Sequence, residues 1–115
     1  MTTQTYRDAA RLLLAQGRVE LAAGDVRQAS EKGWGAAAQM VKAIAEQRGW
    51  QHRNHAALFN AVSRLVDETG DDDIGRLFQI ASALHVNFYE NWDNPQSIAR
   101  GLDDIERLLE KLEPL

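Results

Sequence analysis

Apolar residues recur along the chain at spacings of three and four positions, in five successive segments. This periodicity is typical of amphipathic helices that bury one face in a core. The first segment runs from about residue 5 to residue 23, and its stripe consists of Tyr6, Ala10, Leu13, Leu14, Gly17 and Leu21. No alternating run of β-branched residues reaches the length of a strand. The pattern therefore predicts an all-α protein.

Residues that end and begin helices separate the five segments. Glycines that predict helix ends follow the first three segments, at positions 24, 49 and 70. Residues suited to cap a helix N-terminus precede the next four: Asp25, Asn54, the acidic residues 71–73, and Asn94 with Pro95. Short connections between long helices predict antiparallel neighbours. We expect an up-and-down four-helix bundle with an additional short helix, or five helices in total.

The segment from residue 26 to about residue 48 has the widest apolar face. One stripe consists of Ala29, Gly33, Ala37, Met40 and Ile44, and its neighbour of Trp34, Ala38, Val41 and Ala45. We expect this helix to be central in the bundle. Its small residues at positions 29, 33 and 37 would let another helix backbone approach closely.

Composition narrows the class of protein further. The 115 residues predict one domain, residues 1–115, and the absence of cysteine excludes disulfides and thiolate zinc sites. No apolar run approaches the ~20 residues of a membrane span, and the N-terminus does not resemble a signal peptide. We therefore expect a cytoplasmic protein without a membrane partner. The net charge of −4 argues against general DNA or RNA binding, although a local basic site remains open.

One polar face of the second predicted helix contains residues that packing in a bundle does not explain. Gly35 lies there among Lys32, Gln39 and Lys42, although a glycine inside a helix costs roughly 1 kcal/mol relative to alanine. Either a partner or ligand approaches the backbone at Gly35, or a loop of the same chain crosses closely. We regard Lys32, Gly35, Gln39 and Lys42 as candidate ligand-binding residues.

The connection after that helix concentrates basic and imidazole side chains. It contains Arg48, His52, Arg53 and His55 beside Trp50. Arginine can hold a phosphate and neutral imidazole can act as an acid or base near pH 7, so phosphodiester chemistry is one interpretation. The other is a solvated loop whose tryptophan covers the helix junction. We add His52 and Arg53 to the ligand-binding candidates, and expect no metal site because a third ligand is missing.

A third candidate is an aromatic strip on the fourth predicted helix, formed by His85, Tyr89 and Trp92 with Ser82. Aromatic side chains with polar tips suit an interface, and they equally suit the edge of a core. The first predicted helix has a second, thinner apolar stripe beside its main one, formed by Ala9, Leu12, Val19 and Ala23. Together with that stripe, the aromatic strip predicts a homodimer. No Ser-His-Asp triad, phosphate-binding glycine loop or dinucleotide fingerprint is present, and we expect no cofactor.

The sequence QASEKGWGAAA at residues 28–38 resembles the PaREP1 family of small helical proteins. The resemblance continues through VKAIA at residues 41–45, Gly49-Trp50, His52 and LHVNFYE at residues 84–90, and covers about residues 7 to 112. That family is similar to the HEPN superfamily of helical bundles, whose members often dimerise. The resemblance implies a four-to-five-helix bundle and an association with nucleotides, RNA or a nucleotidyltransferase partner.

Many HEPN members are ribonucleases with an arginine and a histidine separated by four to six residues. Arg48 and His55 enclose six residues and meet this spacing, but Gly49 breaks the helix inside the motif. Three hypotheses follow. The first is a non-enzymatic dimeric domain that binds a nucleotide, RNA or a protein partner. The second is a metal-independent ribonuclease that uses Arg48 and His55, as the toxin of a toxin–antitoxin pair. The third is a structural subunit of a larger complex.

Overall fold

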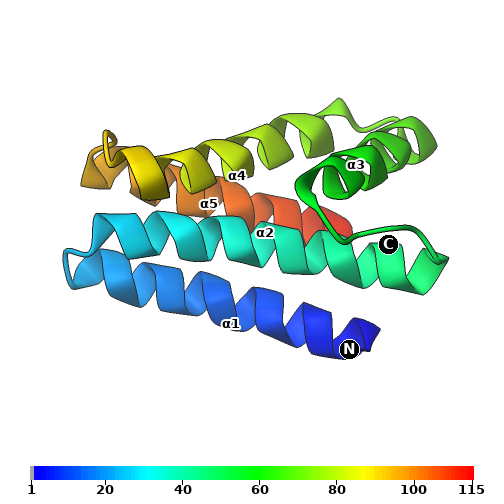
Figure 1. Cartoon of the computed structure of the whole chain (residues 1–115), viewed down its shortest axis with the longest axis horizontal. Coiled ribbons are helices and arrows are strands. Elements are labelled where there is room, and N and C mark those ends of the chain that lie inside the picture. Colours follow the sequence, from blue (N-terminus) through cyan, green and yellow to red (C-terminus); the bar gives the residue numbers. More distant parts are fainter. Residues whose placement is uncertain (1) are drawn as a thin grey trace.

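The computed structural model describes residues 2–115, which form five helices connected by short turns (Figure 1). Their bounds are α1 Thr3–Ala22, α2 Val26–Arg48, α3 His55–Thr69, α4 Asp72–Glu90 and α5 Pro95–Leu112. The helices α1, α2, α4 and α5 run in alternating directions along the long axis of the molecule, and both termini lie at the same end (Figure 1). The shortest helix, α3, links α2 to α4 at that end. The predicted all-α bundle is confirmed.

The helix starts follow the capping residues closely. The side chains of Asn54 and Asn94 accept hydrogen bonds of 2.8 Å from the backbone amides of Ala57 and Ser97. The first helix begins at Thr3, two residues before its predicted start, because the Thr2 hydroxyl accepts a hydrogen bond from the amide of residue 5 at 3.1 Å. Gly49 and Gly70 both have a φ of 71°, the left-handed conformation that ends a helix.

The second helix is central, as its two apolar stripes predict. It is the one helix that packs against each of the other four, and twelve of its side chains or glycine positions are buried. A Cβ atom at Gly33 would lie 2.9 Å from methyl groups of both Leu84 and Leu102. The missing side chain therefore lets α4 and α5 approach α2 together. None of the helices within residues 2–115 is both long and apolar enough to cross a membrane.

Candidate functional site

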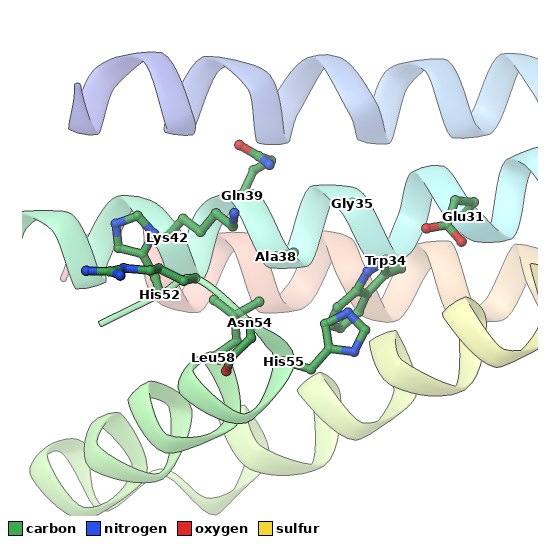
Figure 2. A pocket seen from close by; sticks show the side chains of 11 residues that line it. Glu31, Trp34, Gly35, Ala38, Gln39, Lys42, His52, Asn54, His55 and Leu58 are labelled. Carbon is green, nitrogen blue, oxygen red and sulfur yellow. The ribbon is translucent and has the colours of Figure 1, made fainter. Parts of the chain in front are cut away.

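A groove of about 300 Å³ opens between the polar face of α2 and the chain that leads into α3 (Figure 2). Its lining residues come from two parts of the sequence. From α2 come Glu31, Trp34, Gly35, Ala38, Gln39 and Lys42, and from the chain after α2 come His52, Arg53, Asn54, His55 and Leu58. In Figure 2, His52 lies beside Lys42 at one end, and Trp34 and His55 lie against each other at the other.

The turn after α2 places His52 and Arg53 over the helix that they follow. Gly49 reverses the backbone, and the amide of Trp50 then donates to the carbonyl of Ala45 at 2.8 Å. The ring nitrogen Nε2 of His52 is hydrogen-bonded to the carboxylate of Glu46 at 2.8 Å. This bond fixes the imidazole against α2. The turn is therefore a defined wall of the groove.

Two cations reach the groove without a carboxylate partner. Lys42 and Arg53 form no ion pair within residues 2–115, whereas the two carboxylates nearby are each hydrogen-bonded to a histidine ring nitrogen. Glu46 contacts His52 in this way, and Glu31 contacts His85. The positive charge at this end of the groove is therefore available to a ligand.

The opposite end of the groove carries a cluster of aromatic and imidazole rings. The His55 ring contacts Trp34 and His85 edge to face, with centroids 5.0 and 5.1 Å apart. The Nδ1 atom of His85 is hydrogen-bonded to Glu31 at 2.9 Å. No buried side-chain nitrogen or oxygen within residues 2–115 lacks a partner. The Nε2 atom of His85 forms no hydrogen bond within residues 2–115, so it cannot be one of the buried atoms and must be accessible to solvent.

Five of the six predicted ligand-binding residues lie together in the groove, namely Gly35, Gln39, Lys42, His52 and Arg53. Lys32 does not join them. Its ammonium group lies 3.1 Å from the Gln16 side-chain oxygen and 3.8 Å from Glu20, both on α1. The reason is the absence of a side chain at Gly17, where a Cβ would lie 3.3 Å from the Cβ of Lys32. Helix α1 approaches closely there and draws Lys32 to its own polar side chains.

Gly35 has a structural role besides its place in the groove. A Cβ atom there would lie 3.2 Å from a methyl group of Leu13, so α1 crosses close to the α2 backbone at this point. A close crossing within the same chain is therefore present at Gly35, but helix α1 makes it and not the expected loop. The same glycine also lines the groove, and the two interpretations of Gly35 are compatible.

Arg48 and His55 are not brought together. The Arg48 guanidinium is paired with Glu68 in the last turn of α3 and lies 5.3 Å from the centre of the Trp50 ring. His55 is the first residue of α3, and thirteen residues of helix rise by about 20 Å. The residue spacing of the ribonuclease motif is present, but the two side chains face different surroundings.

The predicted aromatic strip divides into two parts. His85 is half-buried and belongs to the ring cluster beside the groove, and the Tyr89 ring contacts it edge to face with centroids 5.3 Å apart. Tyr89 and Trp92 are 67% and 70% exposed, and Trp92 lies beyond the end of α4 and not on the helix as predicted. Dimerisation through this strip stays a prediction. Glu31, Trp34 and Asn54 line the groove although they were not among the predicted site residues. The sequence could have indicated Glu31 and Trp34, because positions 31, 34, 35, 38 and 42 share one face of a helix.

The fold and the groove define a small five-helix protein with a cationic pocket on one side of its central helix. The chain belongs to the archaeal PaREP1/PaREP8 family, whose family model matches residues 5–109. A search of curated proteins finds no match. The crystal structure of a protein from Sulfolobus solfataricus is similar, with a TM-score of 0.82 and 23% sequence identity over 92% of this chain and 94% of that one. This likeness supports the fold, and the relation to the HEPN superfamily stays a prediction.

Proposed function

We propose that this protein is a non-enzymatic binding domain whose groove between α2 and α3 takes a nucleotide or a short segment of RNA through its phosphate. The observation that carries the proposal is the convergence of Lys42 and Arg53 from two elements on one cavity, with no carboxylate paired to either within residues 2–115. Lysine supplies a compact charge, and arginine supplies a planar set of donors that matches phosphate oxygens.

The remaining lining residues fit the rest of a nucleotide. Gln39 and Asn54 offer amide groups, and Leu58 with Ala38 supplies an apolar surface. A mostly preformed cavity with a few polar groups is typical of small-ligand sites, and about 300 Å³ lies at the lower end of their usual range. The ribonuclease hypothesis gains no support, because Arg48 is paired with Glu68 and not directed toward His55.

The overall charge limits how such a ligand can bind. With a net charge of −4, the protein offers one local cationic site instead of a basic surface. Binding should therefore depend on one or two phosphates. The logarithm of the affinity should fall by only about 0.7 to 1.4 per decade of salt, which is the slope for one or two neutralised phosphates on a single strand.

Titration of the purified protein with uridine monophosphate, followed by NMR and calorimetry, tests the proposal. We expect Lys42→Ala and Arg53→Ala each to weaken binding about tenfold, because each removes a charge-assisted contact. Arg100→Ala is the matched control, since Arg100 is an exposed cation of α5 that forms no ion pair within residues 2–115. Equal losses in all three variants, or no shift at residues 35–55, would contradict the proposal.

A further inference from the structure

A second cavity adjoins the groove and shares a wall with it. This cavity has a volume of about 330 Å³ and is lined by Glu46, Gly49, Trp50 and Gln51, together with His52 and Arg53. His52 and Arg53 also line the groove. The two residues therefore form a partition with a cavity on each side, and a ligand that crosses it would contact Arg53 near its middle.

The charges around the two cavities leave room for one anion, beside Lys42 and Arg53. These two cations lie at or beside the partition, Glu31 lines the groove, and Glu46 lines the second cavity with its carboxylate 2.8 Å from Nε2 of His52. A second phosphate in either cavity would meet a carboxylate, and like charges repel. Uncharged groups with hydrogen-bond donors, such as nucleobases and sugar hydroxyls, suit those positions better.

The second cavity also offers an aromatic wall. Trp50 is half-buried at the edge of the core, and its cavity side lies beside Arg53 of the partition. The guanidinium groups of Arg64 and Arg48, neither of which lines this cavity, lie 4.1 and 5.3 Å from the centres of Trp50 rings. Aromatic side chains next to cations are the usual elements of single-stranded nucleic-acid sites, because every base has a face that can contact a ring. A phosphate-binding site for a mononucleotide does not require this second cavity.

We infer that the two cavities together hold a dinucleotide unit of single-stranded nucleic acid. The phosphodiester lies at Lys42 and Arg53, one nucleoside occupies the groove, and the next contacts Trp50 in the second cavity. This inference rests on the proposed function, since it needs the same phosphate site. It adds that the ligand is an oligonucleotide and that Trp50 contributes to its affinity.

A comparison of uridylyl-(3′→5′)-uridine with uridine 3′-monophosphate by calorimetry tests the inference. The monoester carries nearly two negative charges at pH 7, whereas the phosphodiester carries one. If the phosphate site alone decided affinity, the monoester would bind more tightly. We expect the dinucleotide to bind about tenfold more tightly in spite of its lower charge, which is the scale of one base–aromatic contact.

The variant Trp50→Ala tests whether Trp50 causes the tighter binding of the dinucleotide. In this variant the dinucleotide should bind no better than the wild-type protein binds the mononucleotide, while mononucleotide affinity is unchanged. Trp92→Ala is the matched control, because Trp92 is 70% exposed and lies outside both cavities. Circular dichroism checks that each variant folds. If Trp50→Ala does not fold, quenching of fluorescence in a Trp34→Phe/Trp92→Phe protein, in which Trp50 is the one remaining tryptophan, replaces it: dinucleotide should quench and mononucleotide should not.

The outcomes separate this inference from the proposed function. If the dinucleotide and the mononucleotide bind with equal affinity, and Arg53→Ala weakens both, the dinucleotide inference is wrong and the proposed phosphate site stands. If neither probe binds at millimolar concentration, the dinucleotide inference and the proposed function are both wrong. Thymidylyl-(3′→5′)-thymidine serves as a deoxyribose arm. Tight binding of either dinucleotide supports the inference, and the ratio of the two affinities shows whether RNA or single-stranded DNA is preferred.

Discussion

At the residue scale, two glycines of α2 that are two positions apart face different neighbours. A Cβ at Gly33 would meet methyl groups of Leu84 and Leu102 at 2.9 Å, and both leucines are buried. A Cβ at Gly35 would meet one methyl group of Leu13 at 3.2 Å, and Leu13 is only half-buried. Packing therefore excludes a side chain at Gly33 much more strongly than at Gly35.

Alanine substitutions should reveal this difference in the free energy of unfolding. We expect Gly33→Ala to destabilise the protein by about 1–3 kcal/mol, the usual effect of overpacking a core. The free energy of unfolding of Gly35→Ala should be within about 0.5 kcal/mol of the wild-type value, or higher than it. The reason is that Leu13 can shift and that alanine favours a helix by about 1 kcal/mol relative to glycine. Urea denaturation measures both, and equal losses would refute the distinction. A stable Gly35→Ala protein that no longer binds nucleotide would show that Gly35 is needed for the ligand.

At the element scale, one buried side chain organises the turn between α4 and α5. The side-chain oxygen of Asn87 accepts hydrogen bonds from the amides of Trp92 and Asp93 at 3.0 and 2.8 Å, and its amide nitrogen donates to Ser30 at 3.2 Å. Asn91 has a φ of 53° and ends α4 in the left-handed conformation. Asn87 thereby connects α2, the end of α4 and the start of the turn.

Removal of this side chain should loosen the turn. We expect Asn87→Ala to lower the free energy of unfolding by about 1–3 kcal/mol, because two partly buried backbone amides lose their acceptor. Asn91→Gly is the control in the same turn, and it should be neutral or slightly stabilising since glycine adopts a positive φ without strain. Thermal unfolding compares the two variants, and a milder effect at Asn87 than at Asn91 would contradict this role.

At the scale of the whole molecule, ion pairs tie distant parts of the chain together. The acidic start of α4 is paired with the end of α5, with Lys111 lying 2.8 Å from Asp71. Glu113, beyond α5, is paired with Arg11 of α1. The hydrogen bond from Lys111 lowers the pKa of Asp71 below its ordinary 3.8, and the hydrogen bond from Arg11 lowers the pKa of Glu113. The acidic triplet thus does more than cap its helix.

These pKa shifts predict loss of stability in acid. A carboxyl group whose pKa is lower in the folded state stabilises the protein above its unfolded pKa, and this contribution disappears as the pH falls through the folded pKa. Asp71→Asn keeps the oxygen that caps α4, removes the charge, and replaces the oxygen that accepts from Lys111 with an amide nitrogen, which cannot accept. We expect this variant to be less stable than wild type at pH 7, with the difference vanishing once the pH is below the folded pKa of Asp71.

Chemical denaturation between pH 7 and pH 2 measures this dependence. Asp72→Asn is the control, because Asp72 is an exposed carboxylate in the same turn that forms no ion pair within residues 2–115. A constant difference between wild type and Asp71→Asn across this pH range would contradict the assignment. High salt should reduce the effect at pH 7, since the side chains of Lys111 and Asp71 are partly exposed.

Local sequence features predicted nearly all of the fold. Helical periodicity, glycine ends and polar caps depend on residues within a few positions of each other, so the five helices and their order could be deduced without a structure. The two stripes of α2 likewise predicted its central place. The start of α1 was missed by two residues because Thr2 competes with later residues as the cap.

The sequence by itself thus determined the helices, the central helix, the family, and which segments hold unused polar residues. Tertiary structure decided which of those residues meet. Lys42 and Arg53 share a groove because the turn at Gly49 folds residues 52–58 back onto α2. Lys32 and Arg48 are directed elsewhere, by Glu20 and Glu68, which lie twelve and twenty residues away in the chain. A long side chain follows the partner that packing brings near it, and that partner depends on how the helices are placed against one another.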